Sequence, residues 1–248
     1  MHCGERLSGS RRMAMPKVAI IAALEREVSG LIRRSKRVQH HYAGRTFIFY
    51  ELDDAVVVAG GIGVEAARRA SEAAIGLYGV TIVHSVGFAG ALESRLRVGE
   101  VFTPAMVIDA RDGSRTQLEN GSGVLLTQSS VANAGQKAIL GRAYSAQAVD
   151  MEAAGVALAC HAHGIEFRVT KAISDEFDFE MPETARFIDS QGRFQTARFA
   201  LYAALRPWLW SRVVALNRNS ARAAESLVKY LKNSLGEARA GTVEAKTI

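Results

Sequence analysis

Residues 17–35, KVAIIAALEREVSGLIRRS, give the clearest indication of the fold. Its first eight residues are apolar apart from the lysine, which is the composition of a buried β-strand. The residues that follow place Val28, Leu31 and Ile32 at helical spacing, so a helix succeeds the strand directly. An apolar strand that leads straight into a helix is typical of a parallel sheet covered by helices on both faces.

The same alternation of strand and helix continues along the chain. Further strands are predicted at residues 45–52, 55–61, 80–87, 98–110, 123–130 and 165–174, helices at residues 64–79, 132–143 and 151–164, and a polar loop at residues 110–122. The expected fold is therefore a single three-layer α/β/α domain with a central mixed, largely parallel sheet, as in phosphorylase- and hydrolase-like proteins. Ligands in such folds bind at the carboxyl ends of the strands.

The predicted domain covers residues 16–235. Residues 1–15 are polar and basic and lack the apolar segment of a secretory signal, so they are expected to form a disordered arm. Residues 236–248 are expected to be a frayed tail. From about residue 183 to residue 235 the sequence predicts a helical C-terminal extension with a break near Pro207.

The C-terminal extension carries aromatic residues among arginines: Phe199, Tyr202, Trp208 and Trp210. Two interpretations stay open. Packing of these helices against the sheet is favoured, and an amphipathic helix that lies on a membrane surface is the alternative. At most a weak contact with a membrane is expected.

Composition excludes several classes of protein. The chain has 248 residues, a net charge of +6 and two cysteines, Cys3 and Cys160, which are too few for a disulfide framework or a zinc site. We expect no metal, no nucleic-acid partner and a cytoplasmic location. The sequence also lacks the GxGxxG motif of dinucleotide-binding oxidoreductases and an apolar run of about 18 residues.

Two glycine-containing turns follow predicted strands. AGGIGVEAA, residues 59–67, places Gly63 between a strand and a helix, where backbone N–H groups can approach an anion or a hydroxyl cluster. HSVGFAGAL, residues 84–92, ends a second strand. Each stretch on its own also fits a plain tight connection.

Three acidic stretches have both a structural and a functional interpretation. Glu27 lies in the first turn of a helix, where the helix dipole stabilises a carboxylate whatever its role. Asp175 ends a strand, where it can serve catalysis or cap a following helix. AVDMEAAGVA, residues 148–157, is either a capped helix start or a cradle for a ligand with hydroxyl groups.

Four stretches taken in order carry a family resemblance. IIAALEREV (20–28), GGIGVEAA (60–67), VGFAGAL (86–92), and AVDMEAAGVALAC with FRVTKAISD (148–175) resemble the nucleoside phosphorylase and nucleosidase superfamily. The resemblance spans about residues 17–178, and the motifs are most similar to those of methylthioadenosine/S-adenosylhomocysteine nucleosidases. It implies cleavage of the N-glycosidic bond of a purine nucleoside without a metal or redox cofactor, by a homo-oligomer, with a dimer favoured.

The resemblance also implies roles for single residues. Met151 would pack on the ribose and Glu152 would accept hydrogen bonds from its 2′ and 3′ hydroxyls, with Asp150 behind them as support. Asp175 would give a proton to the departing purine, and Ser174 would orient it. Such a reaction separates charge between sugar and base, so it needs an acid at the base and an anion at the sugar.

Whether water or phosphate attacks the sugar stays open. Glu27 would polarise a water molecule, which favours hydrolysis, whereas phosphorolysis would use phosphate as a co-substrate and needs cationic ligands, for which Arg45 and Arg68 are candidates. Phe88 replaces a small polar residue that is common in the nucleosidases. The expected substrate-binding set is completed by Gly63, Phe88, Ala89, Gly90 and Val131.

The middle of the chain departs from the nucleosidases. It is several tens of residues shorter, and Val131 stands where those enzymes carry the aromatic residue that stacks on the purine. Together with the C-terminal extension, this shortening resembles the hopanoid-associated phosphorylase branch, which implies phosphorolysis of a lipid-linked adenosyl substrate as the alternative. A nucleoside-binding protein with impaired catalysis is the remaining alternative.

Overall fold

The computed structural model of the chain describes residues 18–180, 185–189 and 191–244. The strands are β1 (Val18–Ala22), β2 (Lys36–Tyr42), β3 (Arg45–Glu51), β4 (Ala55–Ala59), β5 (Ile82–Ala91), β6 (Val101–Phe102), β7 (Met106–Asp109), β8 (Arg115–Gln117), β9 (Val124–Thr127), β10 (Ala148–Asp150) and β11 (Glu166–Asp175). The helices are α1 (Glu25–Ile32), α2 (Val64–Tyr78), α3 (Ala134–Tyr144), α4 (Ala153–His163), α5 (Thr196–Ala204) and α6 (Trp210–Glu244), with 3₁₀ turns η1 (Ala185–Phe187) and η2 (Pro207–Leu209).

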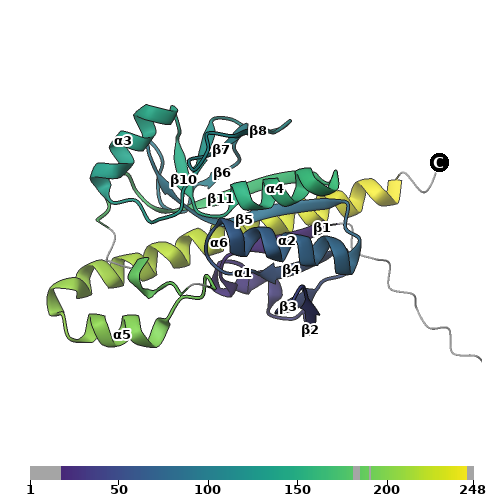
Figure 1. The fold of residues 1–248 in the computed structure, drawn as a ribbon, viewed down its shortest axis with the longest axis horizontal. Helices are drawn as coiled ribbons and strands as arrows, with labels where there is room; N and C mark the ends of the chain where they lie inside the picture. The colour runs from purple at the N-terminus through teal and green to yellow at the C-terminus, as the bar shows by residue number, and fades with distance from the viewer. Residues whose placement is uncertain (1–17, 181–184, 190, 245–248) are drawn as a thin grey trace, which may run out of the picture.

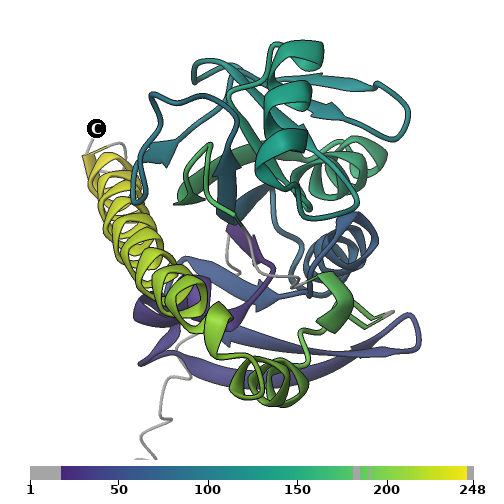
Figure 2. The ribbon, with the colours of Figure 1, turned by 90° about the vertical axis from the view of Figure 1, so that its left-hand side faces the viewer.

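All the strands belong to one mixed sheet with helices on both faces (Figures 1 and 2). Its order is β2-β3-β4-β1-β5-β10-β9-β7-β8, and β11 pairs with β5 and β6. β1 pairs in parallel with β4 and β5, and β11 pairs in parallel with β5. The predicted three-layer fold around a mixed sheet is confirmed.

The apolar strand at the start of the chain shows why both faces of the sheet are covered. Ala19 and Ile21 pack into a core formed with α2 and α4, whereas Ile20 and Ala22 pack into a second core formed with α1 and α6. Successive side chains of a strand point to opposite faces, so a strand buried on both sides must be apolar throughout. β1 therefore lies at the centre of the molecule.

The topology gathers several chain segments at one edge of the sheet. The carboxyl ends of β1, β4, β5 and β11 meet there because these strands are parallel. β10 pairs antiparallel with the end of β5, with Val149 opposite Gly90. Because β10 runs antiparallel to β5, the residues after it head toward the carboxyl end of β1, across β5 from β11.

Two local expectations are wrong, and two strands were not predicted. One of these strands is β10, at residues 148–150, directly before the helix predicted over 151–164, which begins as α4 at Ala153. The predicted strand over residues 98–110 is divided into β6 and β7 around Pro104, which has no N–H to donate to a ladder. The predicted loop at residues 110–122 contains β8, and the polar strand β2 was not predicted.

The C-terminal helices pack against the sheet over only part of their length. Ala223, Leu227 and Leu231 of α6 lie in the core beside α1, as the favoured interpretation expects. The predicted break is present as η2, between α5 and α6. α5 and the first turns of α6 extend beyond the sheet (Figure 1), and Trp208 and Trp210 are 70% and 54% exposed.

Both predicted chain ends lie partly or wholly beyond the described residues. The expected arm at residues 1–15 and the last four residues of the expected tail fall outside them. Within the described part, α6 continues to Glu244 and so passes through the start of the expected tail. No helix among the described residues is long and apolar enough to cross a membrane.

Candidate active site

A cavity of about 530 Å³ lies at the carboxyl ends of the central strands. Almost every candidate residue lines it: Glu27, Phe88, Ala89, Gly90, Val131, Asp150, Met151, Glu152, Ser174 and Asp175. Gly63 does not line the cavity, but its N–H binds Glu152 from behind. Segments that are far apart in the sequence are therefore brought together as the resemblance implies.

Glu27 is held at the junction of β1 and α1. Its Oε2 accepts hydrogen bonds from the N–H groups of Ala23 at 3.0 Å and Leu24 at 3.2 Å. A Cβ atom at Gly87, whose φ is 137°, would lie 2.8 Å from the same oxygen, so glycine is needed beside it. Burial raises the pKa of Glu27, and the nearby Lys171 ammonium only partly offsets this. A buried carboxylate with a raised pKa is suited to take a proton from water.

Glu152 lies at the N-cap position of α4. Its Oε1 accepts a hydrogen bond from Gly63 N–H at 2.9 Å, and its Oε2 accepts one from Met151 N–H at 3.3 Å. The glycine turn thus binds a carboxyl group of the protein itself. Burial, and then the neighbouring Asp150 carboxylate, raise the pKa of Glu152 to about 8.

Asp150, two residues before Glu152, forms a buried ion pair that the sequence reasoning missed. Lys171 Nζ lies 2.9 Å from Asp150 Oδ2, and both side chains are wholly buried. Asp150 also accepts hydrogen bonds from the Thr127 hydroxyl at 2.6 Å and from Ala153 N–H at 2.8 Å, and so caps α4. The feature of the sequence that could have indicated this ion pair is Lys171 itself, a single lysine in an otherwise largely apolar strand.

Lys171 is the cation that faces three buried carboxylates. Burial disfavours its ammonium form, but Asp150, Glu152 and Glu27 outweigh that effect, so the pKa of Lys171 is raised. In return, Lys171 lowers the pKa values of Glu27 and Glu152. Lys171 thus favours the charged forms of Glu27 and Glu152 and partly offsets the effect of their burial.

Asp175, the last residue of β11, also lines the cavity. Its Oδ1 accepts a hydrogen bond from the Ser174 hydroxyl at 2.7 Å, and its Oδ2 accepts one from Lys137 Nζ. A Cβ atom at Gly90 would lie 2.7 Å from Oδ2, which explains the glycine there. No helix follows Asp175 in the described residues up to 180, so helix capping does not account for it.

Lys137 is the second residue that the sequence reasoning missed. It lies on α3, is 1% exposed and lines the cavity. The spacing of apolar residues in α3 does not indicate that Lys137 is buried, because Ile139 on the same helix is 63% exposed. A periodicity argument would bury the isoleucine and expose the lysine.

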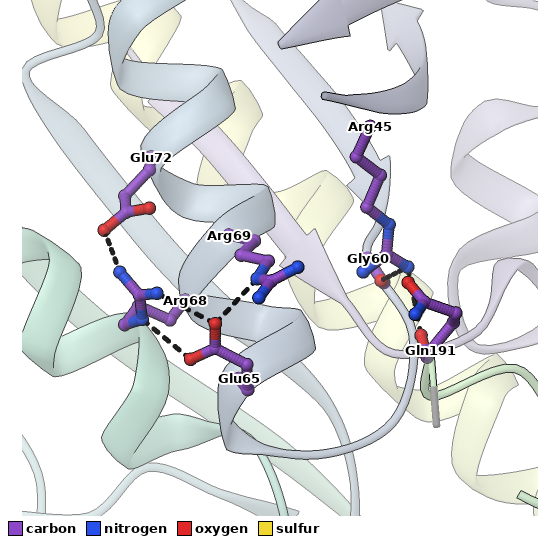
Figure 3. A network of polar contacts seen from close by, with 7 residues as sticks. All are labelled: Arg45, Gly60, Glu65, Arg68, Arg69, Glu72 and Gln191. Carbon is purple, nitrogen blue, oxygen red and sulfur yellow. Dashed lines mark hydrogen bonds and ion pairs between the residues drawn. The ribbon is translucent and has the colours of Figure 1, made fainter. Parts of the chain in front are cut away.

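The two arginines considered as phosphate ligands are engaged elsewhere (Figure 3). Arg45 donates to the carbonyls of Gly60 at 3.2 Å and Gln191 at 3.0 Å, and Arg68 pairs with Glu65 and Glu72. Neither arginine lines the cavity. Both candidate assignments are therefore wrong.

The C-terminal extension contributes an apolar wall that was also missed. It is formed by Phe194, Phe199, Val213, Val214 and Leu216. Phe88, on β5, lines the cavity and also packs against the core that contains Leu227 of α6. Its side chain therefore lies between the sheet and the C-terminal helices. In the described residues, no group of three or more His, Cys, Asp or Glu side chains could hold a metal ion.

The chain is similar to proteins of known activity. Two curated relatives are 5′-methylthioadenosine/S-adenosylhomocysteine nucleosidases. That of Exiguobacterium sp. is 29% identical over 66% of this chain and 87% of the relative, and that of Shewanella denitrificans is 25% identical over 67% and 89%.

Solved structures share the fold. Futalosine hydrolase of Helicobacter pylori has a TM-score of 0.65 and 18% identity, and S-adenosylhomocysteine nucleosidase of Streptococcus pyogenes has a TM-score of 0.62 and 20% identity. Each comparison covers 90% of this chain and 98% of the other. A family model described as the phosphorylase superfamily matches residues 17–140 and 123–206, which is most of the chain. The chain therefore belongs to the phosphorylase superfamily.

Proposed function

We propose that the protein hydrolyses the N-glycosidic bond of an adenine-type nucleoside and releases the free base. The observation that carries this proposal is the convergence of Glu27, Glu152 and Asp175, all buried, on one cavity. The curated nucleosidases that resemble the chain support the same reaction.

The three acids divide the work between the two fragments of the substrate. Glu152 accepts hydrogen bonds from the ribose hydroxyls. Lys171 favours the carboxylate form of Glu152, which places negative charge beside the sugar as it becomes oxocarbenium-like. Glu27 takes a proton from the attacking water. Asp175, with its partners, faces the base, which leaves with the electron pair of the broken bond.

Water is favoured over phosphate as the attacking group. Phosphate carries between one and two negative charges near neutral pH and is usually bound by arginine together with backbone N–H groups. Arg45 and Arg68 are committed to other partners, whereas Glu27 is a buried carboxylate with a raised pKa at the junction of β1 and α1. A carboxylate at that place repels phosphate and activates water.

The reaction product tests the proposal. The protein is incubated with methylthioadenosine, adenosylhomocysteine, adenosine and inosine, with and without phosphate, and the sugar product is identified. We expect the free sugar, at a rate that does not depend on phosphate, and we expect Glu27→Gln to abolish its formation. A sugar 1-phosphate, formed only when phosphate is present, would contradict hydrolysis.

One observation favours a second candidate, cleavage of an adenosyl group attached to a lipid. The apolar wall of the cavity reaches the protein surface, because Val214 both lines the cavity and is strongly exposed. Exposed apolar side chains continue from it along the C-terminal helices: Leu201, Leu205, Trp208 and Trp210. Arginines accompany them, which is the composition of a helix that binds an anionic membrane surface.

Binding to lipid vesicles tests this second candidate. We expect the protein to sediment with anionic vesicles at low salt, and the double variant Trp208→Ser and Trp210→Ser to remain largely in solution. Leu158→Ser, which removes an exposed apolar side chain from α4, is the matched control and is expected to sediment like the wild type. Equal binding by all three proteins, or none by the wild type, would contradict membrane contact through these helices.

A further inference from the structure

The group that faces the departing base is an ion pair rather than a single acid. Lys137 Nζ donates to Asp175 Oδ2 and to the carbonyl oxygen of Glu176 at 2.7 Å. The Ser174 hydroxyl donates to the other oxygen, Asp175 Oδ1. Since both carboxylate oxygens accept hydrogen bonds, one of them from an ammonium group, Asp175 is ionised in this arrangement.

An ionised Asp175 has no proton of its own to give to the base. The Lys137–Asp175 pair can still supply one proton, because the ammonium group of Lys137 carries one proton more than a neutral amine. An ammonium group has three N–H donors, and two acceptors among the described residues take two of them. Lys137 lines the cavity, so its remaining donor is available to a ligand there.

Burial keeps this proton in place. The side chains of Lys137 and Asp175 are 1% and 6% exposed, so little water competes for the hydrogen bond between them. The pair also packs closely against Gly90, where a Cβ atom would lie 2.7 Å from Asp175 Oδ2 and 3.4 Å from Lys137 Cε.

We infer that Lys137 holds the proton that the departing base takes up, and that it acts through Asp175. This inference rests on the proposed function. The bond between C1′ of the sugar and the base nitrogen breaks, and its electron pair stays on the base. One proton passes from Lys137 Nζ to Asp175 Oδ2 and from there to a ring nitrogen of the base, which leaves Lys137 as a neutral amine. The attacking water adds its oxygen to C1′ and gives a proton to Glu27, from which it returns through solvent to Lys137.

A pair of substrates distinguishes proton supply from a structural role. The base of methylthioadenosine must be protonated as it leaves, whereas p-nitrophenyl β-D-ribofuranoside releases nitrophenolate, which leaves without a proton. If Lys137 supplies the proton, its loss affects only the first substrate. If Lys137 only shapes the cavity or holds Asp175 in place, both substrates suffer alike.

The experiment measures kcat and KM of the full chain and its Lys137→Met variant on both substrates. We expect kcat for methylthioadenosine to fall by at least about 10²-fold with little change in KM, and the nitrophenyl riboside to be cleaved at close to the wild-type rate. Lys137→Gln, which keeps N–H donors but has no ammonium proton, is expected to behave in the same way and serves if the methionine variant does not fold. Lys36→Met removes a lysine that is 70% exposed and is the matched control.

Two results would overturn the inference, and they differ from failure of the proposed function. Equal losses on the two substrates would make Lys137 a structural residue, and undiminished cleavage of methylthioadenosine would remove it from the reaction. Failure of the proposed function appears in the wild type instead, as no release of base from any nucleoside, and it would overturn the inference with it.

Discussion

Replacing Asp175 with Asn is expected to lower kcat for release of the base by about 10²–10⁴-fold and to leave a folded protein. The amide keeps the size of the side chain and one oxygen that can accept from Lys137. It cannot pass a proton to the base, because an amide does not gain and lose a proton near neutral pH. The loss should therefore appear in kcat, while KM for the nucleoside changes little.

The matched control for this substitution lies three residues further along the chain. Asp178 is exposed, in the turn that follows β11, so Asp178→Asn makes the same chemical change away from the cavity. We expect it to retain wild-type kcat. Steady-state release of adenine, together with thermal unfolding of both variants, checks the prediction. An Asp175→Asn enzyme with full activity would show that the base leaves without help from this carboxyl group.

The sequence was sufficient to predict the three-layer fold because its central strands are unambiguous. β1 is apolar along its whole length and runs directly into α1, which only a sheet covered on both faces explains. Short or polar strands carried no comparable signal. β2 has a polar composition, and β10 has three residues that merge in sequence with α4, so only their pairing in the sheet reveals them.

The acids of the site could be predicted, and their cationic partners could not. Glu27, Glu152 and Asp175 lie in motifs that resemble a family, and the cavity brings them together. Lys137 and Lys171 are buried, which is rare for lysine. Each is buried because it pairs with a carboxylate from a distant part of the chain, and the local sequence does not reveal that partner. The apolar wall from α5 and α6 was missed for the same reason, since it depends on how the extension folds back.

Replacing Lys171 with Met is expected to lower the free energy of unfolding by about 3–5 kcal/mol at neutral pH. The substitution leaves Asp150 wholly buried without its cation, beside Glu152 and Glu27. The length of methionine nearly matches that of lysine, so the loss comes mainly from the unpaired charge and not from a cavity. Lys36→Met, at an exposed pair, is the matched control and is expected to change stability by no more than about 0.5 kcal/mol.

The loss of stability in Lys171→Met should depend on pH, and the pKa of Glu152 determines the direction of that dependence. Its pKa is about 8 in the folded protein and 4.5 as the ordinary value, so the folded state binds more protons between those limits. The stability that this provides is complete below about pH 4.5 and is lost as the pH rises through about 8. Without Lys171, which lowers the pKa values of Glu152 and Glu27, these groups hold their protons to still higher pH.

Urea denaturation of the wild type and of Lys171→Met at pH 5.5 and pH 8 therefore checks both the size and the direction of the effect. At the lower pH the carboxylates of the variant can take up protons and neutralise one another's repulsion, so the difference from the wild type should shrink. Adding Asp150→Asn to Lys171→Met removes the unpaired charge itself and should recover part of the lost stability at pH 8. A loss of equal size at both pH values, or no recovery in the double variant, would mean that packing and not charge makes Lys171 necessary.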